Sequence, residues 1–217
     1  MGAETGPVPS KRERTRCAIL DAAITVIAEK GLESSSIDDL MATAGMARGT
    51  FYNYFHCREE VLHAVVGMLR EIITREVISR LPRGLAPEEI IACTTYGYLR
   101  FCLDHPRIGT VLAKIGGFSL WEQNEDDTHP GAECIRTAIV KLSEEPTSPT
   151  SVRIYLEGLA NTLLWRTLAG RLDLNRAEEI IALELRGLGV GNSRISAALD
   201  TARRFAATIR TDTAGNT

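Results

Sequence analysis

Apolar residues recur every three or four positions along most of the chain, which is the spacing of one buried face of an α-helix. The clearest example is the segment 14–30, where Ile19, Ala23, Val26 and Ile27 fall on one side. The same periodicity predicts helices over residues 37–44, 47–55, 58–80, 87–104, 106–118, 132–145, 151–172, 175–188 and 194–209. From residue 86 onward no segment has the pattern of a strand. We therefore predict an all-α protein.

The segment 34–60 carries the most specific local signals. Ser36 is a good N-cap, and Asp39 stands at the position of the acidic partner in a capping box. Gly45 follows the apolar face of this helix where a left-handed C-cap residue is expected. These signals predict a short helix, a tight turn and a second short helix over residues 47–55.

The second short helix presents polar and small residues on the side away from the core. With about 100° per residue, an inward Phe51 places Phe55 beside it on the buried side. The outward residues are then Gly49, Thr50, Tyr52 and Asn53, with Arg48 and Tyr54 at the edges.

Such an outward surface is typical of a helix-turn-helix, whose second helix enters the DNA major groove. Gly49 allows close approach of the backbone, and Thr50 offers a hydroxyl and a methyl group. The Asn53 amide has the geometry that pairs with adenine, and Arg48 can bind either guanine or a phosphate.

The run GMARGTFYNYF at residues 45–55, with the segments 15–31, 37–44 and 58–62, resembles the tetracycline-repressor (TetR) family of bacterial regulators. The resemblance covers roughly the first third of the chain at motif level. It departs at Ala47, where the family usually has a Ser or Thr cap, and at Cys57, where Ser or Asn is common. The missing cap at Ala47 typically costs about 1 kcal/mol.

The resemblance implies roles for residues at matching positions. It implies that Thr50, Tyr52, Asn53 and Tyr54 contact DNA, with Arg48 beside them, and that Ser35, Ser36 and Arg58 hold phosphates. It also implies a homodimer, a palindromic double-stranded operator and a small-molecule effector. We expect a flexible arm at 1–13, a three-helix DNA-binding domain at 14–57, a helical ligand-binding and dimerisation domain at 58–210 and a flexible tail at 211–217.

Two late helices, 151–172 and 175–188, are apolar over much of their girth and are candidates for the dimer interface. The stripes comprise Leu156, Leu159, Leu163, Ile180, Ile181, Leu185 and Leu188. Leu183 adds apolar surface on another side. The alternative is that these stripes form the core of a single subunit.

Several middle-region residues are candidates for an apolar effector pocket with a few polar groups, as the resemblance implies. They are Tyr96, Phe101, Phe118, Trp121, Tyr155, Asn161 and Trp165. Taken singly, each aromatic residue is better explained by ordinary core packing, and a dimer-interface hydrogen bond or plain exposure is the alternative for Asn161.

Composition fits an ordinary globular protein of 217 residues with 44% hydrophobic and 24% charged residues. The net charge is −3, and residues 1–56 hold six basic against seven acidic side chains. No global positive field therefore attracts nucleic acid. The cluster Lys11, Arg12, Arg14 and Arg16 can supply a local one, although its first two residues also suit a solvated terminus.

The five cysteines lack CxxC spacing, which indicates a reducing cytoplasm with neither disulfides nor zinc. Cys57 is either an inert residue or, less simply, a thiol that senses oxidants. Histidine, serine and acidic residues show no catalytic grouping, so we expect neither an enzyme nor a cofactor or metal site. No apolar run reaches the length of a membrane span.

These observations favour a cytoplasmic homodimeric repressor that an effector releases from its operator. One alternative is an activator or global regulator of the same architecture without ligand-driven release. The other is a helical ligand carrier or enzyme with a vestigial helix-turn-helix.

Overall fold

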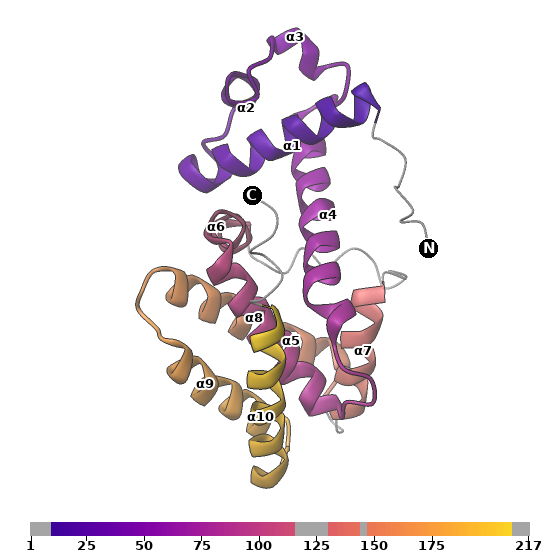
Figure 1. Ribbon diagram of the computed structural model, residues 1–217, viewed down its shortest axis with the longest axis vertical. Coiled ribbons are helices and arrows are strands. Elements are labelled where there is room, and N and C mark those ends of the chain that lie inside the picture. Colours follow the sequence, from indigo (N-terminus) through magenta and orange to yellow (C-terminus); the bar gives the residue numbers. More distant parts are fainter. Residues whose placement is uncertain (1–9, 116–129, 144–146, 210–217) are drawn as a thin grey trace, which may run out of the picture. The chain divides into compact units, whose positions relative to one another are not determined.

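The computed structural model describes residues 10–115, 130–143 and 147–209, and all regular elements in these ranges are helical (Figure 1). The predicted all-α class is therefore confirmed. The elements are α1 (Lys11–Lys30), α2 (Ile37–Thr43), α3 (Arg48–Phe51), α4 (Arg58–Glu76), the 3-10 turn η1 (Ile78–Arg80), α5 (Pro87–Asp104), α6 (Pro106–Lys114), α7 (Pro130–Leu142), α8 (Pro149–Leu168), α9 (Leu174–Gly187) and α10 (Asn192–Ile209).

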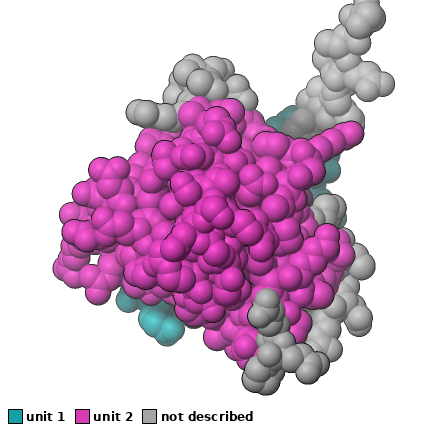
Figure 2. Space-filling view, turned by 90° about the horizontal axis from the view of Figure 1, so that it is seen from below, with its two compact units in different colours: residues 1–68 teal, residues 69–217 magenta. Residues whose placement is uncertain are grey.

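The chain forms two compact units, residues 1–68 and 69–217, which Figure 2 colours separately. The division falls inside α4, so this helix begins in one unit and continues into the other.

In the first unit, α2 packs against α1 and α3, and apolar side chains of α1 and α2 are buried. Ile19, Ile27, Leu40 and Met41 are at most 2% exposed. The helix α1 begins at Lys11, three residues earlier than predicted, because Ser10 and Glu13 form a capping box. The Ser10 backbone N–H, followed by the Ser10 hydroxyl, lowers the pKa of Glu13.

The predicted helices 47–55 and 58–80 are both shorter in the structure. The predicted helix 47–55 is regular only over α3, and tight turn bonds follow it, from Asn53 N–H to Thr50 O at 3.2 Å and from Tyr54 N–H to Phe51 O at 2.9 Å. No side chain caps Ala47, so the segment has little helical stability of its own. The predicted helix 58–80 ends as α4 at Glu76, and η1 follows it.

The second unit is built around α5, which packs against α6, α7, α8, α9 and α10. The contact with α10 is especially close at Gly97, where an added Cβ would lie 2.8 Å from Phe205 and 2.9 Å from Ile209. Arg194 donates two hydrogen bonds of 2.7 Å to the buried Glu88 carboxylate. The last helix, α10, therefore packs against α5.

The second unit buries one carboxyl group, that of Glu184, for which the described residues supply no hydrogen bond. Glu184 on α9 is 0% exposed, and neither of its carboxyl oxygens has a hydrogen-bond partner among the described residues. It lies on the same side of the helix as the buried Ala177 and Ile181. Burial raises the pKa of Glu184 to about 8, because a charged carboxylate loses its hydration there.

The raised pKa makes stability dependent on pH. The unfolded chain releases the Glu184 proton near pH 4.3 whereas the folded chain retains it to about pH 8. Below the unfolded pKa this group therefore costs the folded state nothing. As the pH rises from there towards 8, the free energy of unfolding falls by on the order of a few kcal/mol.

We expect Glu184→Gln to remove most of this loss, because the amide stays neutral at every pH. Urea unfolding of both proteins at pH 5, 7 and 8.5 measures the difference. Glu179→Gln, an exposed change on the same helix, is the control and should retain the wild-type slope. Equal slopes in wild type and Glu184→Gln would contradict the assignment.

Candidate nucleic-acid interface

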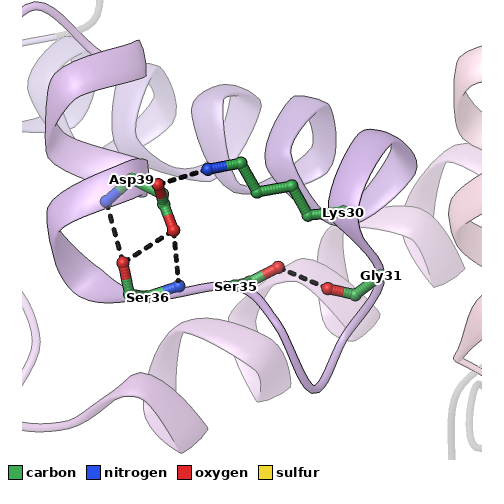
Figure 3. Close-up of polar contacts among 5 residues, drawn as sticks. All are labelled: Lys30, Gly31, Ser35, Ser36 and Asp39. Atoms are coloured by element: carbon green, nitrogen blue, oxygen red, sulfur yellow. Dashed lines mark hydrogen bonds and ion pairs between the residues drawn. The ribbon is translucent and has the colours of Figure 1, made fainter.

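The start of α2 is fixed by a compact set of polar contacts (Figure 3). The Ser36 hydroxyl accepts from Asp39 N–H at 3.1 Å, and Asp39 Oδ2 accepts from Ser36 N–H at 3.2 Å. Lys30 Nζ donates to Asp39 Oδ1 at 2.5 Å. The Lys30 ammonium, followed by the Ser36 hydroxyl, lowers the pKa of Asp39 to about 2. The predicted capping box is confirmed, and it joins α2 to the end of α1.

The turn between α2 and α3 depends on a left-handed glycine. Gly45 has φ of 66°. Its N–H donates to Ala42 O at 3.1 Å, while Met46 N–H donates to Met41 O at 2.9 Å. This pair of bonds is the Schellman pattern, which ends a helix and redirects the chain. The predicted C-cap at Gly45 is confirmed.

The segment after this turn has the inward and outward sides that the sequence predicts. Phe51 and Phe55 are 0% and 1% exposed. Tyr52 is 50% exposed, and Gly49 and Asn53 are exposed as well. The half-buried side chains are those of Thr50 and Tyr54. A polar surface backed by two buried aromatic rings is therefore available to a partner.

Arg48 has two neighbours on this surface. Its Nη1 donates to Asp38 Oδ2 at 2.6 Å, and both side chains are more than half exposed. The side chain of Tyr52, followed by the carboxylate of Asp38, raises the pKa of the Arg48 guanidinium. The sequence pattern did not indicate this pairing, because Asp38 and Arg48 lie on different helices.

Ser35 and Arg58 occupy positions that differ from the expected phosphate contacts. Ser35 is 2% exposed and its hydroxyl donates to Gly31 O at 2.6 Å (Figure 3), so it faces the protein interior. Arg58 Nη1 donates to Leu32 O at 3.2 Å and to Ser35 O at 3.1 Å. The guanidinium thus holds the loop before α2. Ser36 is exposed, but its hydroxyl is engaged in the cap.

The basic cluster near the N-terminus lies on the first turns of α1. Lys11, Arg12, Arg14 and Arg16 are all exposed. The Arg16 guanidinium lies 5.3 Å from the centre of the Phe55 ring, which is within the range of a cation–π contact. One end of the unit therefore carries positive charge although its total charge is not positive.

The proposed effector residues are only partly brought together. Tyr96 and Phe101 are buried on α5, while Phe118 and Trp121 lie outside the described residues. Tyr155 and Trp165 are 42% and 50% exposed, so they do not belong to a closed core. The Oδ1 atom of Asn161 is buried without a partner in the described part of the chain.

The predicted dimer stripes also divide between two sides of α8 and α9. Four of their residues are at most 8% exposed within a single subunit, namely Leu156, Leu163, Ile181 and Leu185. The others, Leu159, Ile180 and Leu188, are half-buried. The strongly exposed apolar side chains are instead Ile154 at 61%, Trp165 at 50% and Leu183 at 58%. Periodicity identified the apolar faces, but could not tell core from outer surface.

Two kinds of feature are not found among the described residues. They contain no group of three or more His, Cys, Asp or Glu side chains that could hold a metal ion. Among the same residues, no helix combines the length and apolar character that crossing a bilayer requires.

Comparisons with known proteins match the part of the chain that carries this polar surface. Residues 19–65 match the family described as bacterial regulatory proteins, tetR family. The chain is 43% identical over 63 residues to the HTH-type transcriptional regulator YvdT of Bacillus subtilis strain 168, covering 29% of this chain and 32% of that protein. It is 32% identical over 78 residues to the HTH-type transcriptional repressor Rv3405c of Mycobacterium tuberculosis, covering 36% and 42%. The matches thus span less than half of either relative.

The fold similarity extends much further along the chain. The TetR family protein CprB of Streptomyces coelicolor, solved in complex with its biological operator sequence, aligns with a TM-score of 0.57 at 20% identity. The alignment covers 92% of this chain and 100% of that one. At this identity the likeness concerns the fold.

The position of Arg58 leads to a test of its role. We expect Arg58→Ala to lower the free energy of unfolding by about 1.5–3 kcal/mol, because charged hydrogen bonds to the loop carbonyls are lost. Thermal and urea unfolding measure this change, with the exposed Arg12→Ala as control. A normally stable Arg58→Ala protein that binds every duplex more weakly would instead favour the phosphate contact.

Proposed function

We propose, from its similarity to the TetR family of helix-turn-helix transcriptional regulators, that the protein represses transcription as a homodimer on a palindromic operator. A small molecule bound in the second unit would release it from DNA. The observation that carries the proposal is the exposed polar side of residues 48–54, fixed from behind by the burial of Phe51 and Phe55.

The exposed side chains suit direct readout of bases. Asn53 can pair with adenine, Thr50 offers a hydroxyl and a methyl group, and Arg48 has N–H groups beyond the one that contacts Asp38. Tyr52 and Tyr54 have hydroxyls for phosphates or base edges. The exposed basic residues at the start of α1 can bind phosphates, which supplies affinity independent of sequence.

Dimerisation through α8 and α9 is supported by their uncovered apolar surface. Ile154, Trp165 and Leu183 on these two helices are each at least half exposed, so they offer apolar surface that another molecule can cover. Gly158 lies four residues after Ile154 and has open space where a side chain would stand, so a second helix can approach closely. Two-fold symmetry would place recognition segments about 34–36 Å apart, which matches successive major grooves.

A small-molecule effector is supported by buried polar atoms in the second unit. Thr74 Oγ1 and Asn161 Oδ1 have no hydrogen-bond partner among the described residues. The buried Tyr98 hydroxyl lies near the weakly bonding Cys102 thiol, and its pKa is raised, first by burial and then by Cys102. Such atoms are costly to bury unless a ligand or water satisfies them. A ligand releases DNA only if it binds the non-binding conformation more tightly.

The function is tested by selecting duplexes that the wild-type protein retains from a random pool. A repressor of this design should retain a palindrome with half-sites about one helical turn apart, and deletion of its gene should raise target transcripts. Lower transcripts would indicate an activator. The absence of salt-dependent binding to any duplex, together with tight binding of a metabolite, would indicate a ligand carrier.

Asn53→Ala should reduce discrimination at one position of each half-site by about 1–3 kcal/mol, the usual worth of a bidentate base contact. Titrations of the selected duplex and of its single-base variants measure this loss. Asn175→Ala, which removes an exposed amide from α9, is the matched control. If Asn53→Ala retains the full preference at every position, Asn53 does not read a base.

Leu183→Glu should yield a monomer, since a charge would replace an exposed apolar side chain within the proposed interface. Val140→Glu makes the same change at a 53% exposed position on α7 and should leave the dimer intact. Sedimentation equilibrium measures the mass of each protein. A dimeric Leu183→Glu protein would exclude this face as the interface.

A further inference from the structure

Asp38 is an acidic residue on the same surface as the proposed DNA-reading side chains. Its carboxylate lies 2.6 Å from Arg48 Nη1 and its side chain is 64% exposed. Its neighbour Asp39 points elsewhere, because both of its oxygens are engaged by Lys30 and Ser36. An exposed carboxylate here would repel the phosphates of any approaching duplex. Asp38 therefore lowers affinity for DNA unless it has another role.

We propose that Asp38 is a specificity-determining residue that holds Arg48 in position for a base and withholds it from phosphates. This proposal rests on the proposed function, because it requires that residues 48–54 meet DNA. Asp38 acts through Arg48 and contacts no base itself, so it is a positioning residue.

The chemistry of arginine explains how an ion pair can favour one kind of contact. Guanidinium has five N–H donors in a planar fork, so the bond to Asp38 leaves an edge free to bind guanine bidentately. The ion pair with Asp38 and the neighbouring Tyr52 side chain also restrict the long side chain before DNA arrives. The side chain then loses less conformational entropy when it binds its base.

On a duplex without the correct base, the same pair opposes binding. Without Asp38, Arg48 could swing towards a phosphate, which lies beside every base pair and carries no sequence information. With Asp38 present, that movement must break the ion pair and brings a carboxylate towards the phosphates. Specificity is a ratio of affinities, and a contact that weakens the wrong complexes raises it.

The backbone between α2 and α3 fixes the positions of Asp38 and Arg48 relative to each other. Asp38 lies in the first turn of α2, which the Ser36–Asp39 capping box fixes, and Arg48 is the first residue of α3. The left-handed Gly45 sets the direction of the chain between them. Both partners are thus anchored by backbone contacts independent of their own side chains.

The test compares Asp38→Asn with Glu33→Gln, which removes one negative charge from an exposed position in the same unit. The probes are the duplex selected by the wild-type protein and a scrambled duplex of equal length. Asp38→Asn should bind the scrambled duplex about three- to fivefold more tightly, change little on the selected duplex, and so lose specificity by that factor. The salt slope on the scrambled duplex should steepen by about one unit per subunit.

Glu33→Gln should shift both affinities equally, so its ratio should match the wild type. A second comparison uses the Arg48→Ala protein, in which Asp38→Asn should no longer alter the ratio. This comparison remains decisive if Asp38→Asn weakens α2, and thermal unfolding of each variant reports that separately.

Three results would overturn the inference. Asp38→Asn could leave the specificity ratio unchanged, could match Glu33→Gln on both probes, or could change the ratio equally without Arg48. In each case the wild-type protein still prefers its selected duplex, so the proposed function stands. A wild-type protein without preference for any duplex would overturn the proposed function and this inference together.

Discussion

Burial of Phe51 and Phe55 is the interaction on which the candidate interface depends. Full burial of such side chains contributes about 1.5–3 kcal/mol each, which exceeds the deficit of about 1 kcal/mol from the absent cap at Ala47. The ring centres lie 5.9 Å apart, so the two anchors also contact each other. The segment therefore holds its position through its buried side and not through its own helical stability. This arrangement leaves the opposite side free to carry residues chosen for binding.

The sequence predicted those parts of the fold that depend on local periodicity and capping. The buried side of residues 47–55, the cap at Ser36 and the turn at Gly45 each follow from residues a few positions apart. Ser35 and Arg58 could not be assigned in this way. Their partners are loop carbonyls of Gly31, Leu32 and Ser35, and the sequence gives no direct signal for where a loop carbonyl points.

The second unit shows a related limit on what periodicity can reveal. A helix that is apolar on more than one side is expected to pack against neighbours on both sides. The sequence pattern does not show which neighbour covers which side. Leu156 and Leu163 face the core of the subunit, while Ile154 and Trp165 on the same helix remain exposed. The close contact of Gly97 with Phe205 and Ile209 was equally hidden, because it joins residues more than one hundred positions apart. Packing decided both cases.

For attraction to a polyanion, the distribution of charge over this protein's surface matters more than its net charge. The chain carries a net charge of −3, yet exposed basic residues gather on the first turns of α1. Two carboxylates of the same unit are engaged by hydrogen bonds within the protein. Lys30 and Ser36 donate to Asp39, and the Ser10 backbone N–H donates to Glu13. Attraction to a polyanion falls with distance over about a Debye length, roughly 8 Å at physiological salt. Under the proposed function, the basic end of this weakly charged unit is therefore the part that attracts the duplex.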